Sequence, residues 1–166
     1  IAPMDIRTRA DYDHGPNEVL AVLTDPDFVA ATVNQMSVGG QSHQVTTRGD
    51  HTVVTTRRTL PTDDLPDVAK KFAGPVLILD EVQDWGPAGP DGARHGTVTL
   101  RIDGVPVALT GTLDLTPSAK GATQEVRADL KAKVPLIGGT IEKAAAPAII
   151  AGIDAVAEMA KERLHG

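Results

Sequence analysis

The feature that most limits how this chain can fold is the long helix predicted at its C-terminal end. From Ile141 onward the sequence keeps a helical period for about 26 residues, which corresponds to a length of about 39 Å. Charged side chains collect on one side of this helix, and mostly small residues collect on the other. The residues on that second side are Ile141, Ala145, Ala148, Ile149, Gly152, Val156 and Met159. A helix with so thin an inner face either packs very closely on its partner or leaves a space beneath it.

Pro147 lies inside the predicted helix. The proline ring removes one intrahelical hydrogen bond and crowds the carbonyl group of Lys143, so we expect a kink at this point. Close packing is the ordinary state of protein interiors. A cavity is the alternative, because ligand pockets are mostly apolar concavities with a few polar groups. The elements that precede the helix bear on this choice.

Composition excludes several classes of function. A chain of 166 residues is long enough for one domain with its own core. The formal net charge of −6 disfavours binding to the phosphate backbone of nucleic acids. Aromatic residues make up only 2% of the chain, which leaves almost nothing from which a stacking platform for bases could be built. The core must therefore be aliphatic.

Cysteine is absent, so disulfides, thiol nucleophiles and cysteine metal sites are excluded. This absence fits the reducing cytoplasm, which is the location we expect. No apolar run is long enough to span a bilayer, and the chain does not open with a signal-peptide pattern. Met4 has the position of a native start, so residues 1–3 are interpreted as a cloning remnant and left out of the fold prediction.

The N-terminal part predicts one strand and two short helices. Residues 5–12 alternate between charged and less polar side chains, as a half-buried strand does. Pro16 suits the first turn of a helix, and Asp25-Pro26 ends that helix and begins another. Two helices that meet in an elbow are therefore expected over residues 16–36.

Gly49-Asp50 marks the first of two clear hairpins among six predicted antiparallel strands. A two-residue loop at this point pairs Thr47 with Thr52. The Arg-Gly-Asp triplet that contains the loop is therefore interpreted as a turn rather than an adhesion motif.

Asp103-Gly104 marks the second hairpin, because this pair is typical of a type I′ turn. The register set by the turn gives three cross-strand pairs: Ile102 with Val105, Leu100 with Val107, and Val98 with Leu109. All six apolar side chains then fall on one face of the sheet, so turn chemistry and hydrophobic pattern agree.

Residues 61–75 interrupt the strands with prolines and charged residues, and one helical turn is expected after Pro66. Phe72, with Leu65 and Val68, would form either a mobile lid or a small apolar cluster under this loop.

The predicted order of elements resembles the helix-grip fold of the START and polyketide cyclase-like (SRPBCC) superfamily, which includes the plant pathogenesis-related proteins. The opening "YDHGPNEVLAVLTDPDFVAA" is similar to the start of that superfamily's sequences. More narrowly, "KVPLIGGTIEKAAAP", "LPDVAKKFAGP" and "DEVQDW" resemble an actinobacterial domain of unknown function, family 2505, within it. The resemblance runs from Met4 to Leu164. It implies one α+β domain over residues 4–166, in which a curved antiparallel sheet of about seven strands (β-α-α-β6-α) wraps around the final helix.

The same resemblance implies an apolar cavity for lipids, sterols, polyketides or other hydrophobic small molecules, without implying one activity. We therefore expect a protein that binds or carries such a molecule, with no nucleic-acid partner. A polyketide cyclase or aromatase is the first alternative, and it would need at least two polar side chains that converge in the cavity. A protein-interaction module, such as a small homodimer, is the second, and it would show a contiguous apolar surface patch.

Candidate ligand-binding residues follow from strand parity and from the thin face of the final helix. Three charged residues share the parity of apolar neighbours on their strands: Arg58, Asp80 and Arg94. An arginine over an apolar pocket can hold a carboxylate or phosphate group, and the alternative is a charge at the rim. Trp85 is a plug of the core or part of the site. The predicted ligand-binding set is Val54, Arg58, Ile78, Trp85, Arg94, Val98, Leu100, Val107, Leu109, Ile141, Ala145, Ala148, Ile149 and Gly152.

Signatures of catalysis and metal binding are absent from the sequence. The five histidines show no i, i+4 spacing and no HExxH pattern, and there is no P-loop and no G-x-S-x-G elbow. We therefore expect no metal, no cofactor and no catalytic residue.

Overall fold

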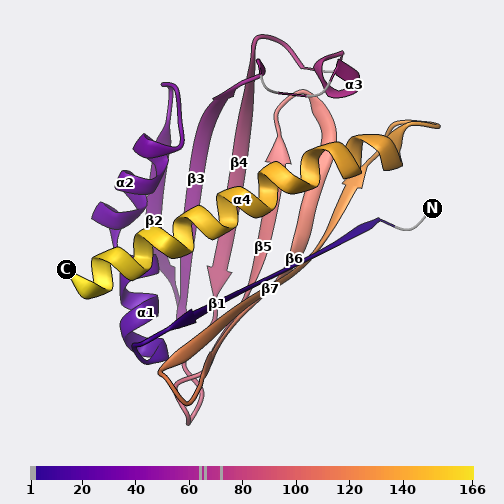
Figure 1. The fold of residues 1–166 in the computed structure, drawn as a ribbon. Helices are drawn as coiled ribbons and strands as arrows, with labels where there is room; N and C mark the ends of the chain where they lie inside the picture. Colours follow the sequence, from indigo (N-terminus) through magenta and orange to yellow (C-terminus); the bar gives the residue numbers. More distant parts are fainter. Residues whose placement is uncertain (1–2, 64, 66, 72) are drawn as a thin grey trace.

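Seven strands form one curved antiparallel sheet, and the longest helix crosses one of its faces (Figure 1). This computed structural model describes residues 3–63, 65, 67–71 and 73–166. The strands are β1 (Met4–Tyr12), β2 (Ser42–Arg48), β3 (His51–Pro61), β4 (Val76–Trp85), β5 (Arg94–Ile102), β6 (Val105–Pro117) and β7 (Ala122–Ala132). The described residues also form α1 (Pro16–Leu23), α2 (Pro26–Gln35), α3 (Asp67–Lys70) and α4 (Gly138–His165). The predicted α+β helix-grip arrangement is confirmed.

Sequence-adjacent strands pair from β2 to β7, and β1 joins the sheet beside β7. The turn between β2 and β3 has Gly49 at a φ of 63°, and the turn between β5 and β6 has Gly104 at 71°. A positive φ is what a type I′ turn requires, and glycine adopts it without strain. The predicted pairing of Thr47 with Thr52 is confirmed.

The hairpin of β5 and β6 differs from the prediction in its register. The pairs in the structure are Ile102 with Val105, Leu100 with Leu109, and Val98 with Gly111. The predicted partners of Leu100 and Val98 were therefore wrong by two residues. The register shifts between Arg101 and Ile102, close to Pro106, which has no N–H to donate to the ladder. Since a shift of two residues preserves the face of every side chain, the apolar residues keep their predicted side of the sheet.

The helix α4 begins at Gly138, earlier than the predicted Ile141, and continues through Pro147. A Cβ at Gly138 would lie 2.5 Å from the carbonyl oxygen of Ala132, so the close approach of the helix to the end of β7 requires glycine here. The helices α1 and α2 contact α4 from one end of the sheet, and α3 contacts it from the other (Figure 1). Among the helices of the described residues, none is both long and apolar enough to cross a membrane.

Candidate ligand cavity

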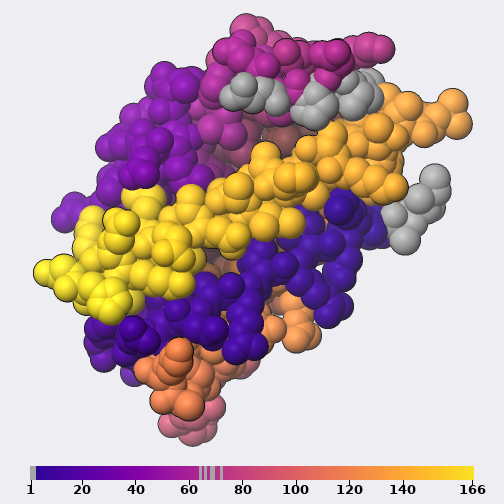
Figure 2. Space-filling view, viewed as in Figure 1, coloured from indigo at the N-terminus to yellow at the C-terminus, as the bar shows by residue number. Residues whose placement is uncertain are grey.

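A cavity of about 350 Å³ lies between the sheet and α4. Strands β1 and β3 to β7 form its floor, α4 crosses above it, and α2 forms one end. Figure 2 shows a hollow on this face of the molecule, between α4 and the segment that contains α3. Most of the lining side chains are apolar, and the volume falls within the usual range of small-molecule sites, about 300 to 1,000 Å³.

The small residues of α4 make this space. Ala148 lines the cavity, although part of its surface is also exposed to solvent. Gly152 lines the same space, and a Cβ there would contact only the side chain of Met36, which follows the last residue of α2, at 3.5 Å. The small side chains on this face of α4 therefore leave room beneath the helix.

Many of the sequence-predicted residues come together around the cavity. Those that line it are Val54, Arg58, Val98, Leu100, Leu109, Ala145, Ala148, Ile149 and Gly152. They come from four elements, β3, β5, β6 and α4, so the fold assembles them from distant parts of the sequence.

Five predicted residues lie elsewhere: Ile78, Trp85, Arg94, Val107 and Ile141. Trp85 is fully buried and plugs the core, and Val107 and Ile141 are buried in the same core. Arg94 has the inward parity that was expected, but its Nε donates to the carbonyl oxygen of Gly86 at 2.7 Å. Its guanidinium is therefore used to hold the end of β4 rather than to line the cavity.

The facing of β4 was predicted wrongly. Ile78 and Asp80 lie on the outer face of the sheet, where Asp80 accepts hydrogen bonds of 3.0 and 3.1 Å from Arg57. The alternate residues of β4 face the cavity instead: Leu77, Leu79, Glu81 and Gln83. The reason is the register with β3, which places Glu81 opposite Thr56 and Asp80 opposite Arg57.

Glu81 and Gln83 were missed from the sequence, and they form a polar array on the floor of the cavity. Arg58 donates to Glu81 at 3.3 Å, and Gln83 donates to the second oxygen of Glu81 at 2.8 Å. The indole of Trp85 donates to the side-chain oxygen of Gln83 at 3.2 Å. The array is a chain of donors that ends on one carboxylate, in an otherwise apolar wall.

Arg58 is the cation of this array. Its side chain is 12% exposed and that of Glu81 is 22% exposed, so the pair is largely shielded from water. The Nε atom of Arg58 is buried and has no hydrogen-bond partner. Buried donors are nearly always paired in folded proteins, so an unpaired one at a cavity wall needs an explanation.

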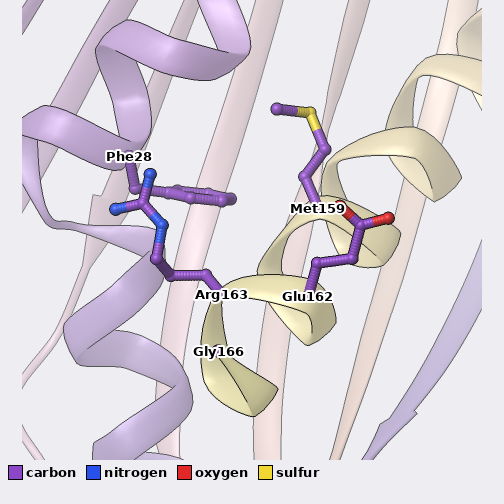
Figure 3. A pocket seen from close by; sticks show the side chains of 5 residues that line it. All are labelled: Phe28, Met159, Glu162, Arg163 and Gly166. Carbon is purple, nitrogen blue, oxygen red and sulfur yellow. The ribbon is translucent and has the colours of Figure 1, made fainter.

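A second pocket, of about 340 Å³, lies at the C-terminal end of α4 (Figure 3). The Arg163 guanidinium lies over the Phe28 ring, 5.4 Å from its centroid, and forms an ion pair of 3.5 Å with Asp25. Phe28 lines both pockets. The two pockets are therefore neighbours.

The predicted lid is described only in part. Leu65 lines the cavity. Phe72 and the side chain of Val68 lie outside the described residues. Across the part of the chain that the structure describes, no group of three or more His, Cys, Asp or Glu side chains is placed to hold a metal ion.

The fold is shared with proteins of very different sequence. Solved structures with this arrangement include TTHA0849 from Thermus thermophilus, at 13% identity and a TM-score of 0.63, with 96% of each chain covered. Another is the Zhui aromatase/cyclase from Streptomyces sp. R1128, at 13% identity and a TM-score of 0.58, with 97% of this chain and 95% of that one covered. A third is Ms6760 from Mycobacterium smegmatis, at 8% identity and a TM-score of 0.58, with 98% and 92% covered. At such identities the likeness shows the fold alone.

Sequence comparison gives a narrower result. No curated protein matches the chain. Residues 7–164 match the family described as "Protein of unknown function (DUF2505)", and the chain therefore belongs to that family.

Proposed function

We propose that this protein binds and carries a hydrophobic small molecule of the lipid, sterol or polyketide class in the cavity beneath α4. The observation that supports this most is the cavity itself, which lies between the sheet and α4, is lined mainly by aliphatic side chains and is roofed in part by small residues of that helix. The helix-grip arrangement also supports the proposed place of the family within the START and polyketide cyclase-like superfamily.

The energetics of such a site favour an apolar ligand. Each methylene group moved from water into an apolar cavity contributes about 0.8 kcal/mol. An alkyl chain of moderate length can therefore offset the lost translational and rotational freedom, which costs roughly 4 to 15 kcal/mol. Small polar metabolites would have to leave water for a wall that offers them few partners.

Native mass spectrometry of protein purified without denaturation tests this proposal. A stoichiometric apolar passenger, identified after extraction, is the expected result, and its chemical class would name the cargo. Empty protein that also shows no mass shift with a panel of lipids, sterols and polyketides would contradict the proposal. That result would favour the interaction module, and the same spectrum would report whether the chain forms a homodimer.

A second candidate is an enzyme of the aromatase or cyclase type. The observation that favours it is the convergence of Arg58, Glu81 and Gln83 on one wall of the cavity. Glu81 would remove a proton next to a ketone of the substrate, and Arg58 would stabilise the enolate oxygen that forms. Formation of an aromatic product from a poly-β-ketone thioester, followed by its absorbance and abolished in Glu81→Gln, would support this activity over simple carriage.

A further inference from the structure

We propose that the ligand presents an uncharged oxygen acceptor, such as an ester, ketone or hydroxyl oxygen, to the guanidinium of Arg58. This inference rests on the proposed function, because it specifies the chemistry of the molecule that the cavity holds. It differs from a general preference for apolar ligands, since it assigns the ligand's head to one wall and its chain to the rest of the space.

The first argument is the donor surplus on Arg58. A guanidinium has five N–H groups, and one bond, to Glu81 at 3.3 Å, is longer than the usual 2.7 to 2.9 Å of such a pair. The Nε–H is buried without a partner. The exposed 12% of the Arg58 side chain lies at the cavity wall, where an acceptor brought by a ligand would take up one of the remaining guanidinium N–H groups.

The second argument is that the neighbouring acceptors are already engaged. Glu81 accepts from both Arg58 and Gln83, and the side-chain oxygen of Gln83 accepts from Trp85. The chain of donors therefore ends at the carboxylate, and Arg58 has further guanidinium N–H groups that these three residues do not take up. An oxygen of the ligand is the complement of that geometry.

The third argument concerns charge. Glu81 already balances the charge of Arg58 inside a wall of low polarity. Two acidic residues, Glu81 and Asp154, line the cavity, and the second arginine that lines it, Arg9, forms an ion pair with Asp11. A carboxylate head would add a further negative charge close to Glu81, and like charges repel strongly where water is scarce. The head is therefore uncharged.

Three ligands with the same alkyl length and different heads test this inference: dodecane, methyl dodecanoate and dodecanoate. Their affinities would be measured by displacement of the uncharged dye Nile red from the full chain. Because one hydrogen bond to a charged donor is worth about a factor of ten in affinity, methyl dodecanoate should bind the unchanged protein about ten-fold more tightly than dodecane. Dodecanoate should bind no more tightly than the ester.

Arg58→Met should remove the advantage of the ester over dodecane. The matched control is Arg57→Met, which alters the next arginine of β3. That arginine lies on the outer face and pairs with Asp80, so its loss should leave the ester's advantage intact.

A measurement on the unchanged protein covers the case in which Arg58→Met fails to fold. In a proton–nitrogen NMR spectrum, the guanidinium resonances of Arg58 should move on addition of methyl dodecanoate and stay in place on addition of dodecane.

The remaining outcomes distinguish failure of this inference from failure of the proposed function. Equal affinity for ester and alkane, or an ester advantage that survives Arg58→Met, would overturn the inference and leave the carrier proposal standing. If dodecanoate bound most tightly of the three, the inference that the head is uncharged would be wrong. Failure of all three compounds to displace the dye would count against the proposed function itself, and the inference would fall with it.

Discussion

The carboxylate of Glu142, near the start of α4, accepts a hydrogen bond of 2.9 Å from the backbone N–H of Ala132, the last residue of β7. Glu142 is only 5% exposed, although it is an acidic residue. Ten residues separate the two partners, so the bond closes the connection between the sheet and the helix. It fixes the N-terminal end of α4 where the helix begins to cross the cavity.

Loss of this acceptor should destabilise the protein. In Glu142→Ala the N–H of Ala132 is left buried without a partner, which costs roughly 1 to 3 kcal/mol. Glu142→Gln retains a side-chain oxygen and should cost clearly less. Urea denaturation gives the free energy of unfolding of both variants, and equal losses in the two would show that the hydrogen bond contributes little.

The cavity can be filled from α4 without altering the sheet. Ala148→Phe places a ring in the space beneath the helix and should weaken binding of an apolar ligand by at least about ten-fold, because the ligand and the ring compete for the same volume. Ala151→Phe is the matched control, since Ala151 is exposed on the same helix and does not line the cavity. Dye binding compares the two, and unchanged affinity in Ala148→Phe would place the ligand elsewhere.

Two glycines should respond to alanine in opposite directions. On β6, a Cβ at Gly111 would lie 2.5 Å from the Cα of Ala128 and even closer to the carbonyl oxygen of Arg127. Because these are backbone atoms that cannot move aside, Gly111→Ala should cost at least about 1 to 3 kcal/mol. Gly139, in the first turn of α4, has nothing within 4 Å of its Cβ position. Gly139→Ala should raise stability by up to about 1 kcal/mol, and thermal unfolding should show the melting temperatures moving apart.

Tyr12 gives a prediction for alkaline pH. Burial raises the pKa of Tyr12 well above its ordinary value of 10.0, and the charge of Glu158 raises it further. The folded state therefore holds the phenol proton more tightly than the unfolded state does. This contribution to stability is complete below pH 10.0 and is lost as the pH rises above it.

Between neutral and strongly alkaline pH, the free energy of unfolding of Tyr12→Phe should fall less than that of the unchanged protein. At neutral pH the variant should be weaker by about 1 kcal/mol, because the hydroxyl donates to Gln124 at 2.7 Å. Denaturant unfolding at several pH values separates the two effects. Parallel pH curves for the two proteins would contradict the raised pKa.

The parts of the fold that depend on local chemistry were predictable from the sequence. Asp25-Pro26 marked the boundary between two helices, and in the structure the Asp25 carboxylate caps α2 by accepting from the N–H of Phe28 at 3.3 Å. Gly49-Asp50 likewise set the register of β2 against β3. In each case the residues that form the feature are neighbours in the chain.

Which residues of β4 face the cavity could not be predicted from neighbouring residues in the chain. The first half of "VLILDEVQDW" is apolar in both parities and the second half is polar in both, so the period of two does not choose a face. Pairing with β3 chooses it, and residues 62–75 separate the two strands. Arg58, a candidate from its own strand, lines the cavity, while its partners Glu81 and Gln83 were missed.

The small residues of α4 also bear on how members of this family can diverge. The sheet supplies a floor in which each side chain is fixed by neighbours on two strands, so a change there disturbs the whole ladder. Ala145, Ala148 and Gly152 have no such constraint on their cavity side, and each can grow by one or a few carbon atoms within the empty volume. Substitutions on this face of α4 would therefore change the size of the cavity and leave the sheet as it is.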